Sequence, residues 1–280
     1  MPGMVIDIHA ETIAAANSAR EKHWAEQLRD TIVIGEAIDL PITESTGGKN
    51  TFFAIFTAET TATPRGAIVL MHGAGVHPDW GDVIHPLRTE LPDKGWATLS
   101  IQLPLTSPEN DQDQEQEQDK KEAASKKQLI EASVARIDAA ISFLKSRSYQ
   151  QIVLISHSFG SLMALNFLQL KMAAETGDTP PVKGAVLLGT PSSGTSLPLN
   201  SPSMIEKITL PLLDLYGSAD RDNVLRSAKA RKTAAHKAGN QRYRQAKIIG
   251  ANHFYNGLND ELLTYVSGWL SKNISNARQK

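Results

Sequence analysis

The sequence of 280 residues contains no cysteine, and this absence excludes disulfide bonds, thiolate metal sites and a cysteine nucleophile. It also contains no apolar run of about 18 residues, the length that a membrane-spanning helix needs. Charges of both signs are spread along most of the chain and give a formal net charge of −1, so no basic patch indicates binding to nucleic acid. The N-terminus lacks the basic start and apolar core of a secretory signal, which leaves the compartment open.

Beyond about residue 64, the chain alternates between strand-like and helix-like segments. Short apolar runs are typical of buried strands, and residues at helical spacing follow most of them. The predicted strands are 67–71, 96–101, 152–155, 185–188, 210–216 and 243–249, and the predicted helices are 80–94, 129–146, a helix from residue 159, 222–238 and 258–271. This alternation predicts an α/β fold, with a mostly parallel sheet of about eight strands and helices on both faces.

The N-terminal part of the chain has a different pattern. Apolar residues among charged ones predict an amphipathic helix over 10–29, so we expect residues 1–30 to form a helical extension on the outside of a single domain that spans 31–280. Two strands, 36–44 and 51–58, flank a loop with two adjacent glycines. They predict an antiparallel edge to the sheet.

Two connections bear on access to a site. Segment 109–119 carries six acidic residues and no basic one, and the residues after it are mixed in charge. Because such a segment cannot bury apolar surface, we expect a flexible solvated insertion at about 107–127; a cover over the site or an acidic docking segment is the alternative. The connection 189–209 has room for a loop and one short helix, which predicts the absence of a large cap domain.

The most informative stretch is 151–162, which reads Q-I-V-L-I-S-H-S-F-G-S-L. A buried strand ends at Ser156 and helical spacing begins at Phe159, so the chain must turn sharply around Ser158. Small residues are needed two positions before and after such a turn; Gly160 fits, whereas Ser156 replaces the usual glycine. This elbow predicts a nucleophilic Ser158, although a serine there could also simply cap the helix.

A serine nucleophile needs a base and a carboxylate that orients the base. His253 follows the strand 243–249 in G-A-N-H, and Asp220 follows the strand 210–216 in G-S-A-D, so both are expected at the same edge as Ser158. The order Ser158, Asp220, His253 is the one expected for this type of hydrolase. Asp220 could instead cap the next helix, and His253 could be an ordinary loop histidine. Asp214 and Asp222 are rival acids.

An oxyanion site needs two N–H donors that point to one place. The strand 67–71 ends in His72-Gly73-Ala74-Gly75, and we expect the N–H of Ala74, or of Gly75 as the fallback, to act beside that of Phe159. Four residues are candidates to line the substrate pocket: His72, His77, Trp80 and Phe254. For His72 the alternative is a role in shaping the loop. We expect the ring of His157 to lie beside the strand rather than to act as the base.

A metal site is the alternative interpretation of the histidines in this region. His72, His77 and His85 stand near Asp79 and Asp82, but their spacing fits neither H-E-x-x-H nor another zinc signature. We therefore expect no metal and no other cofactor.

The same motifs carry a resemblance to the α/β-hydrolase superfamily over about 67–270. More narrowly, H-G-A-G-V-H-P-D-W, G-W-A-T-L-S-I-Q-L-P, L-D-L-Y-G-S-A-D and G-N-Q-R-Y-R-Q-A are similar to a bacterial α/β-hydrolase-like family of unassigned function. The resemblance implies a Ser-His-Asp acyl-enzyme mechanism and a small-molecule acyl substrate, and it implies no particular substrate. Members often begin with an export signal, which favours a periplasmic or secreted origin.

The function expected from these residues is hydrolysis of carboxylic esters, extending to thioesters or amides. One alternative is a binding protein on a hydrolase scaffold, because a fold does not entail an activity. Another is an acyltransferase or perhydrolase, which would keep the three residues and change the acceptor. Whether the chain is a monomer or a dimer stays open.

Overall fold

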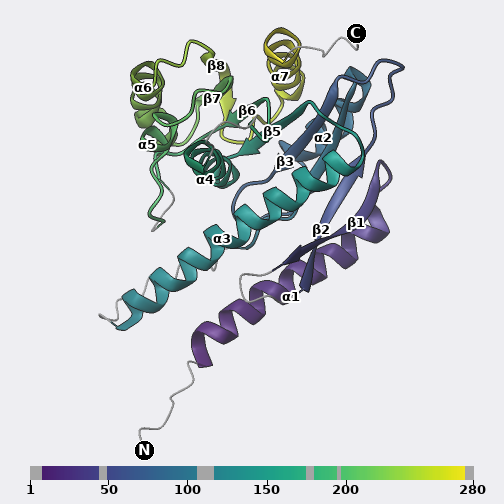
Figure 1. Ribbon diagram of the computed structural model, residues 1–280, viewed down its shortest axis with the longest axis vertical. Helices are drawn as coiled ribbons and strands as arrows, with labels where there is room; N and C mark the ends of the chain where they lie inside the picture. Colours follow the sequence, from purple (N-terminus) through teal and green to yellow (C-terminus); the bar gives the residue numbers. More distant parts are fainter. Residues whose placement is uncertain (1–7, 44–48, 106–116, 175–179, 194–196, 275–280) are drawn as a thin grey trace, which may run out of the picture.

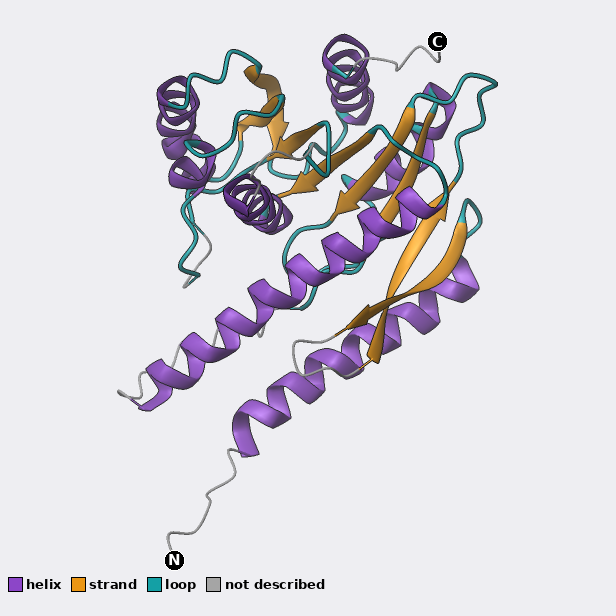
Figure 2. Ribbon diagram, in the orientation of Figure 1, coloured by secondary structure: helices purple, strands orange, loops and turns teal. Residues whose placement is uncertain are grey.

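The computed structural model describes residues 8–43, 49–105, 117–174, 180–193 and 197–274. Within these residues, eight strands form one twisted sheet in the order β1-β2-β4-β3-β5-β6-β7-β8 (Figures 1 and 2). Strand β2 is antiparallel to both of its neighbours, and the pairs from β4 to β8 are parallel. The strands are β1 (Glu36–Thr43), β2 (Lys49–Thr57), β3 (Gly66–Met71), β4 (Trp96–Ile101), β5 (Ile152–His157), β6 (Gly184–Leu188), β7 (Leu212–Ala219) and β8 (Tyr243–Asn252).

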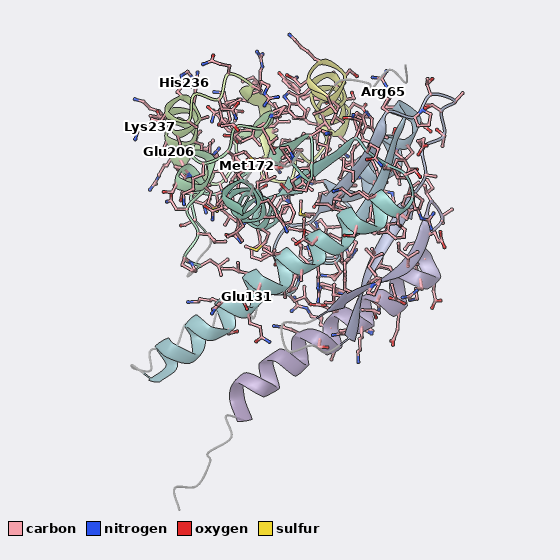
Figure 3. The ribbon with its side chains drawn as sticks, in the orientation of Figure 1. Arg65, Glu131, Met172, Glu206, His236 and Lys237 are labelled. Atoms are coloured by element: carbon pink, nitrogen blue, oxygen red, sulfur yellow. The ribbon has the colours of Figure 1, made fainter. Side chains whose placement is uncertain are left out.

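Helices cover both faces of the sheet. The apolar cluster on one face includes residues of α3, α4, α5 and α6, and the cluster on the other face includes residues of α2 and α7. The exposed side chains of Glu206, His236 and Lys237 stand on the outer side of the first layer (Figure 3). The helices are α1 (Ile8–Thr31), α2 (Ile84–Glu90), the 3₁₀ turn η1 (Pro92–Lys94), α3 (Glu117–Ser146), α4 (Phe159–Ala174), α5 (Ser201–Ile205), α6 (Asp222–Lys237) and α7 (Asn259–Asn273).

Strand β5 shows why the central strands are apolar without alternation. Ile152 and Leu154 join the cluster under α3 and α4, whereas Val153 and Ile155 join the cluster under α2 and α7. All four side chains are at most 1% exposed. Burial of each contributes about 1.5–3 kcal/mol. A sheet covered on both faces needs such strands, and this layering fixes where β5 ends.

Helix α1 packs at the β1–β2 edge. Leu28 forms a small apolar cluster with Phe53 and Ile55 of β2, while the alternate residues of β2 face the layer that contains α3. The N-terminal ends of α1 and α3 both project beyond the strands (Figure 1). None of the helices in the described ranges combines the length and apolar character needed to cross a bilayer.

The predicted fold class is confirmed: the sheet is mostly parallel with an antiparallel N-terminal edge, and α5 is the short helix expected between β6 and β7. Several element boundaries differ, and the largest differences are at α2 and α3. The helix expected over 80–94 is restricted to Ile84–Glu90 followed by a 3₁₀ turn, because Pro92 cannot donate the hydrogen bond that would continue the helix.

The second difference concerns the expected insertion at 107–127. Helix α3 begins at Glu117 rather than near residue 129, so residues 117–127 are helical and not a loop. They are mostly Glu, Gln, Lys and Ala, which are strong helix formers, and charge composition alone concealed this propensity. The rest of the expected insertion falls largely on 106–116, outside the described residues.

Candidate active site

Ser158 occupies the sharp turn between β5 and α4. Its φ angle is +53°, in the left-handed region that side chains other than glycine rarely adopt. The Ser158 N–H donates to the carbonyl of Leu188 at the end of β6, at 2.8 Å, and the Ser158 carbonyl accepts from Ser161 N–H at 2.9 Å. Backbone hydrogen bonds to two elements therefore hold the strained residue, and its side chain lies at the carboxyl edge of the sheet.

The small residues beside Ser158 explain how strand and helix approach. A Cβ atom on Gly160 would lie 2.6 Å from the carbonyl oxygen of His72, closer than real atoms approach. Ser156 is fully buried, and its hydroxyl lies 3.2 Å from Ser161 Oγ and 3.3 Å from the Val186 carbonyl oxygen. Serine fits at this position because its backbone stays outside the left-handed region and its hydroxyl has partners.

The structure brings Ser158, His253 and Asp220 together in one hydrogen-bonded chain. The distance from His253 Nε2 to Ser158 Oγ is 2.9 Å, and the distance from His253 Nδ1 to Asp220 Oδ1 is 2.6 Å. Asp220 and His253 are 6% and 4% exposed. With Asp220 ionised, Nδ1–H donates to the carboxylate, which leaves Nε2 to accept the serine proton.

Asp220 is supported by backbone donors. Its two carboxylate oxygens accept from the N–H groups of Arg221 at 2.7 Å and Gly217 at 3.2 Å. Burial opposes the charged form of this carboxyl group, but the hydrogen bond and charge of His253 and the two backbone donors outweigh it and lower the pKa of Asp220. The carboxylate is thus kept ionised beside the imidazole.

The rival acids are engaged elsewhere. Asp214 is fully buried and forms an ion pair with Arg231 at 2.8 Å, inside the α6 layer. Asp222 is exposed and pairs with Arg226, four residues along α6, at 2.8 Å. Asp220 is therefore the carboxylate that faces His253.

Two glycines let the ends of β6, β7 and β8 converge on this chain. A Cβ atom on Gly217 would lie 2.2 Å from the carbonyl oxygen of Ala251, and a Cβ atom on Gly189 would lie 3.1 Å from the ring of His253. The register of β7 and β8 also shifts between Gly217 and Ala219. Strand β8 consequently runs to Asn252, three residues beyond its predicted end, and places His253 directly after the strand.

The loop after β3 lies beside the serine. A Cβ atom on Gly73 would be 3.6 Å from Ser158 Cβ. Ala74 and Gly75 are exposed, and within the described part of the chain the N–H groups of Ala74 and Phe159 donate no hydrogen bond. Two unused donors therefore lie on the two segments that flank Ser158.

His72 does not line the pocket, which corrects its assignment as a substrate-binding residue. It is 1% exposed; its Nδ1 lies 2.7 Å from the Gly73 carbonyl oxygen, and its Nε2 accepts from Leu103 N–H at 3.0 Å. Burial lowers the pKa of His72 to about 3. The neutral ring braces the loop after β3 against the end of β4.

The other predicted pocket residues, His77, Trp80 and Phe254, take part in two groups of ring contacts. The His77 ring contacts the rings of Trp80 and of Trp24 from α1, with centroid distances of 5.5 and 5.4 Å. The Phe254 ring lies 5.2 Å from the ring of His253 and 5.8 Å from that of His157. The contribution of α1 could not be read from the sequence, because no local pattern shows which loop an external helix will meet.

His157 is the last residue of β5 and lies beside the candidate base. Its Nε2 lies 2.9 Å from the carbonyl oxygen of His253, and the two rings are 4.8 Å apart. Burial, followed by the charge of His253, lowers the pKa of His157 to about 4. The neutral His157 ring therefore holds the His253 backbone without adding positive charge.

Two of the histidines considered for a metal site contact different atoms of Asp79. His85 Nδ1 lies 2.8 Å from Asp79 Oδ1, whereas His77 Nδ1 accepts from Asp79 N–H at 3.2 Å. Among the residues that the structure describes, no group of three or more His, Asp or Glu side chains is arranged to hold a metal ion.

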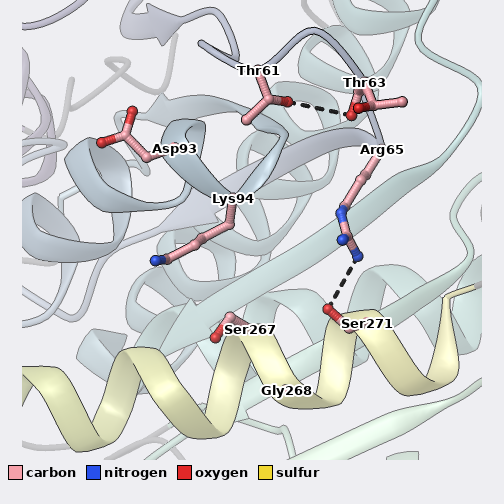
Figure 4. Close-up of a pocket in the computed structure, with 8 residues that line it drawn as sticks. All are labelled: Thr61, Thr63, Arg65, Asp93, Lys94, Ser267, Gly268 and Ser271. Atoms are coloured by element: carbon pink, nitrogen blue, oxygen red, sulfur yellow. Dashed lines mark hydrogen bonds between the residues drawn. The ribbon is translucent and has the colours of Figure 1, made fainter.

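A depression of about 570 Å³ lies at the opposite edge of the sheet (Figure 4). Arg65, directly before β3, donates to the hydroxyl of Ser271 on α7 at 3.1 Å across it. This depression is separate from the Ser158 chain, since it faces the amino end of β3.

Several solved structures resemble this chain. Est1E from Butyrivibrio proteoclasticus is 14% identical with a TM-score of 0.61, over 86% of this chain and 99% of that chain. The dienelactone hydrolase from Anabaena variabilis is 16% identical with a TM-score of 0.60, over 86% and 99%. An α/β serine hydrolase without lid from Xanthomonas campestris is 11% identical with a TM-score of 0.55, over 85% and 94%. At these identities the likeness shows the α/β-hydrolase fold.

No curated protein matches the sequence. A family model described as a protein of unknown function, DUF3530, matches residues 10–272, so the chain belongs to this family.

Proposed function

We propose that this protein is a serine hydrolase that cleaves carboxylic esters of small molecules through an acyl-enzyme intermediate. The observation that carries the proposal is the hydrogen-bonded chain from Ser158 Oγ through the His253 ring to Asp220, at 2.9 and 2.6 Å. The strained φ of Ser158 adds support, because strain at a turn of this kind is typical of a residue held in position for chemistry.

In the acylation step, Ser158 Oγ attacks the ester carbonyl carbon while its proton passes to His253 Nε2. The carbonyl oxygen becomes an oxyanion, and the N–H groups of Phe159 and Ala74 stabilise it in this proposal. Asp220 stabilises the positive charge that forms on His253. The tetrahedral intermediate then breaks, and the leaving alcohol takes the proton from Nε2.

In the deacylation step, water replaces the alcohol. His253 Nε2 accepts a proton from the water as the water oxygen attacks the acyl carbon, and the same two N–H groups stabilise the second oxyanion. Ser158 Oγ leaves with the proton returned by His253. Thioesters and amides would follow the same steps with a thiol or amine as the leaving group.

Two features support a small ester as the substrate. Among the described residues, α5 is the helix between β6 and β7, so no large cap domain stands over the candidate site. Solved structures with the same fold include two that are named esterases and one that is named a dienelactone hydrolase. Both are arguments from the scaffold, and the chemistry rests on Ser158, His253 and Asp220.

The test is labelling by a fluorophosphonate probe together with turnover of acetyl, butyryl and octanoyl esters. We expect the native protein to be labelled and to hydrolyse at least one ester, and Ser158→Ala to lose both. Ser267→Ala is the matched control, because this serine lies on α7 beside the distant depression. Labelling that survives Ser158→Ala would remove Ser158 from the mechanism, and ester turnover no higher than that of the variant would favour a binding protein.

A further inference from the structure

Arg20 brings a positive charge from α1 to the loop after β3. Its Nη2 atom lies 3.9 Å from the position that a Cβ atom on Gly75 would occupy. Helix α1 is fixed here through Leu105, whose carbonyl accepts from the Asn17 side chain at 3.3 Å and whose N–H donates to Glu21 at 3.0 Å. The position of Arg20 is therefore set by the fold.

The charge of Arg20 is not neutralised by the described residues. Among them no carboxylate pairs with it, and its buried Nε has no hydrogen-bond partner. The adjacent acid, Glu21, pairs with Arg136 of α3 at 2.8 Å instead. Arg20 Cζ lies 5.0 Å from the centroid of the Trp24 ring, a contact that orients a cation without cancelling its charge.

The loop between Arg20 and Ser158 is short. Gly73 flanks Ser158 and Gly75 flanks Arg20, and two peptide units separate the Cα atoms of these glycines by no more than about 7.6 Å. Ala74, which supplies a proposed oxyanion donor, lies between them and is exposed. A molecule whose carbonyl lies at Ser158 can therefore extend a few bonds along this loop toward the guanidinium group.

We infer that Arg20 is a specificity-determining residue that selects esters bearing a carboxylate a few bonds from the scissile carbonyl. This inference rests on the proposed hydrolase function and adds the charge class of the substrate. A guanidinium group pairs well with a carboxylate because both are planar, and partial removal from water strengthens the attraction. A half-ester of a short dicarboxylic acid is the simplest substrate of this class.

The test compares two benzyl esters with the same acyl length, benzyl butyrate and monobenzyl succinate, by measuring the release of benzyl alcohol. We expect the native protein to prefer the anionic ester. Arg20→Gln should lower kcat/KM for monobenzyl succinate about 10-fold to 100-fold more than for benzyl butyrate, mainly through KM. Arg20→Lys should restore part of the preference, and added salt should weaken it in the native protein.

Arg29→Gln is the matched control, because it removes the same charge from the same helix. Arg29 pairs with Asp39 of β1, at 2.6 Å. Equal ratios of the two kcat/KM values for Arg20→Gln and Arg29→Gln would overturn the inference. A second arm measures the binding of monobenzyl succinate to Ser158→Ala by calorimetry, with and without Arg20→Gln. Binding that does not depend on Arg20 would overturn the inference even if no ester were hydrolysed, whereas failure of hydrolysis alone would count against the proposed function.

Discussion

At the scale of single residues, the candidate site depends on a carboxylate that stays ionised although it is buried. Asp220 achieves this through three donors: the His253 ring and the backbone N–H groups of Arg221 and Gly217. One of these donors is the imidazole, so the hydrogen bond to Asp220 also decides which nitrogen of His253 carries the proton. Charge and tautomer are linked at one contact.

The first prediction follows from this contact. Asp220→Asn keeps the shape of the side chain but allows His253 to take the tautomer in which Nε2 carries the proton and cannot accept it from Ser158. We expect kcat for ester hydrolysis to fall about 10³-fold to 10⁴-fold, with little change in melting temperature. Steady-state kinetics on a neutral ester measures the effect.

Asp222→Asn is the control for this change, since Asp222 is exposed and pairs with Arg226 on the surface of α6. We expect it to retain the native kcat. A drop of similar size in both variants would show that the loss of kcat does not arise from the contact between Asp220 and His253.

The sequence predicts the positions of these residues better than their surroundings. Ser158, Asp220 and His253 could be found because each follows a strand, and parallel strands bring their carboxyl ends to one edge. The role of His72 could not be predicted, because a histidine after a strand can face the pocket or turn inward. Its inward orientation depends on the position of Leu103, whose N–H it accepts. No motif or spacing in the sequence points to Arg20 as a site residue.

At the scale of elements, the connection from β5 to α4 depends on close packing against β3. Gly160 lies in the first turn of α4, where a Cβ atom would be 2.6 Å from the His72 carbonyl oxygen and 2.8 Å from that of Met71. These contacts are to backbone, which cannot move aside without shifting β3. The loop that carries Ala74 continues from the same strand, so this packing also sets the distance between the two proposed oxyanion donors.

The second prediction compares two glycines in helices. Gly160→Ala should lower the free energy of unfolding by about 1–3 kcal/mol through overpacking, and it should also lower kcat because the loop after β3 must shift. Gly268→Ala should raise the free energy of unfolding by about 0.5–1 kcal/mol, because nothing lies within 4 Å of its Cβ position on α7 and alanine favours a helix. Chemical denaturation of both variants and ester turnover give the comparison.

Opposite signs for the two substitutions are the expected result. Equal destabilisation would mean that the effect arises from the helices in general and not from the contact between α4 and β3.

Element boundaries were harder to predict than element order. The charge of residues 117–127 predicts a loop because it cannot be buried, yet a helix needs no buried face along its whole length when its residues are good helix formers. Strand β8 ran past its predicted end because the bulge opposite Gly217 keeps it paired with β7. The first difference comes from the helix propensity of the segment itself, and the second from a contact that lies outside the local sequence window.

At the scale of the whole molecule, the site joins segments from both ends of the chain. Helix α1 contacts the loop after β3 through Trp24 and His77 and the loop after β4 through Glu21 and Leu105, and residues after β8 supply the candidate base. Two neutral histidines, His72 and His157, are buried between these segments. They link the protonation of the molecule to its folding, because the unfolded chain would protonate both at a higher pH.

The third prediction concerns this linkage. The folded-state pKa values of His72 and His157 are lowered from 6.5 to about 3 and about 4, so between pH 6.5 and 4 the unfolded state binds more protons than the folded state. Stability contributed by the neutral rings is present above pH 6.5 and is lost as the pH falls through this window. Each histidine should add about 1.4 kcal/mol per pH unit to the slope of the unfolding free energy.

His157→Gln separates this effect from general acid sensitivity. The substitution lowers the free energy of unfolding at every pH. It should also reduce by one the number of protons taken up on unfolding, so the slope of the unfolding free energy between pH 4 and 6.5 should fall by about 1.4 kcal/mol per pH unit. His236→Gln is the control, because His236 is exposed on α6 and should leave the slope unchanged. The measurement is chemical denaturation at several pH values. If His157 is neutral in the folded protein, its removal must reduce the slope of the unfolding free energy against pH. Equal slopes for the native protein and His157→Gln would therefore mean that the buried imidazole of His157 does not couple folding to pH.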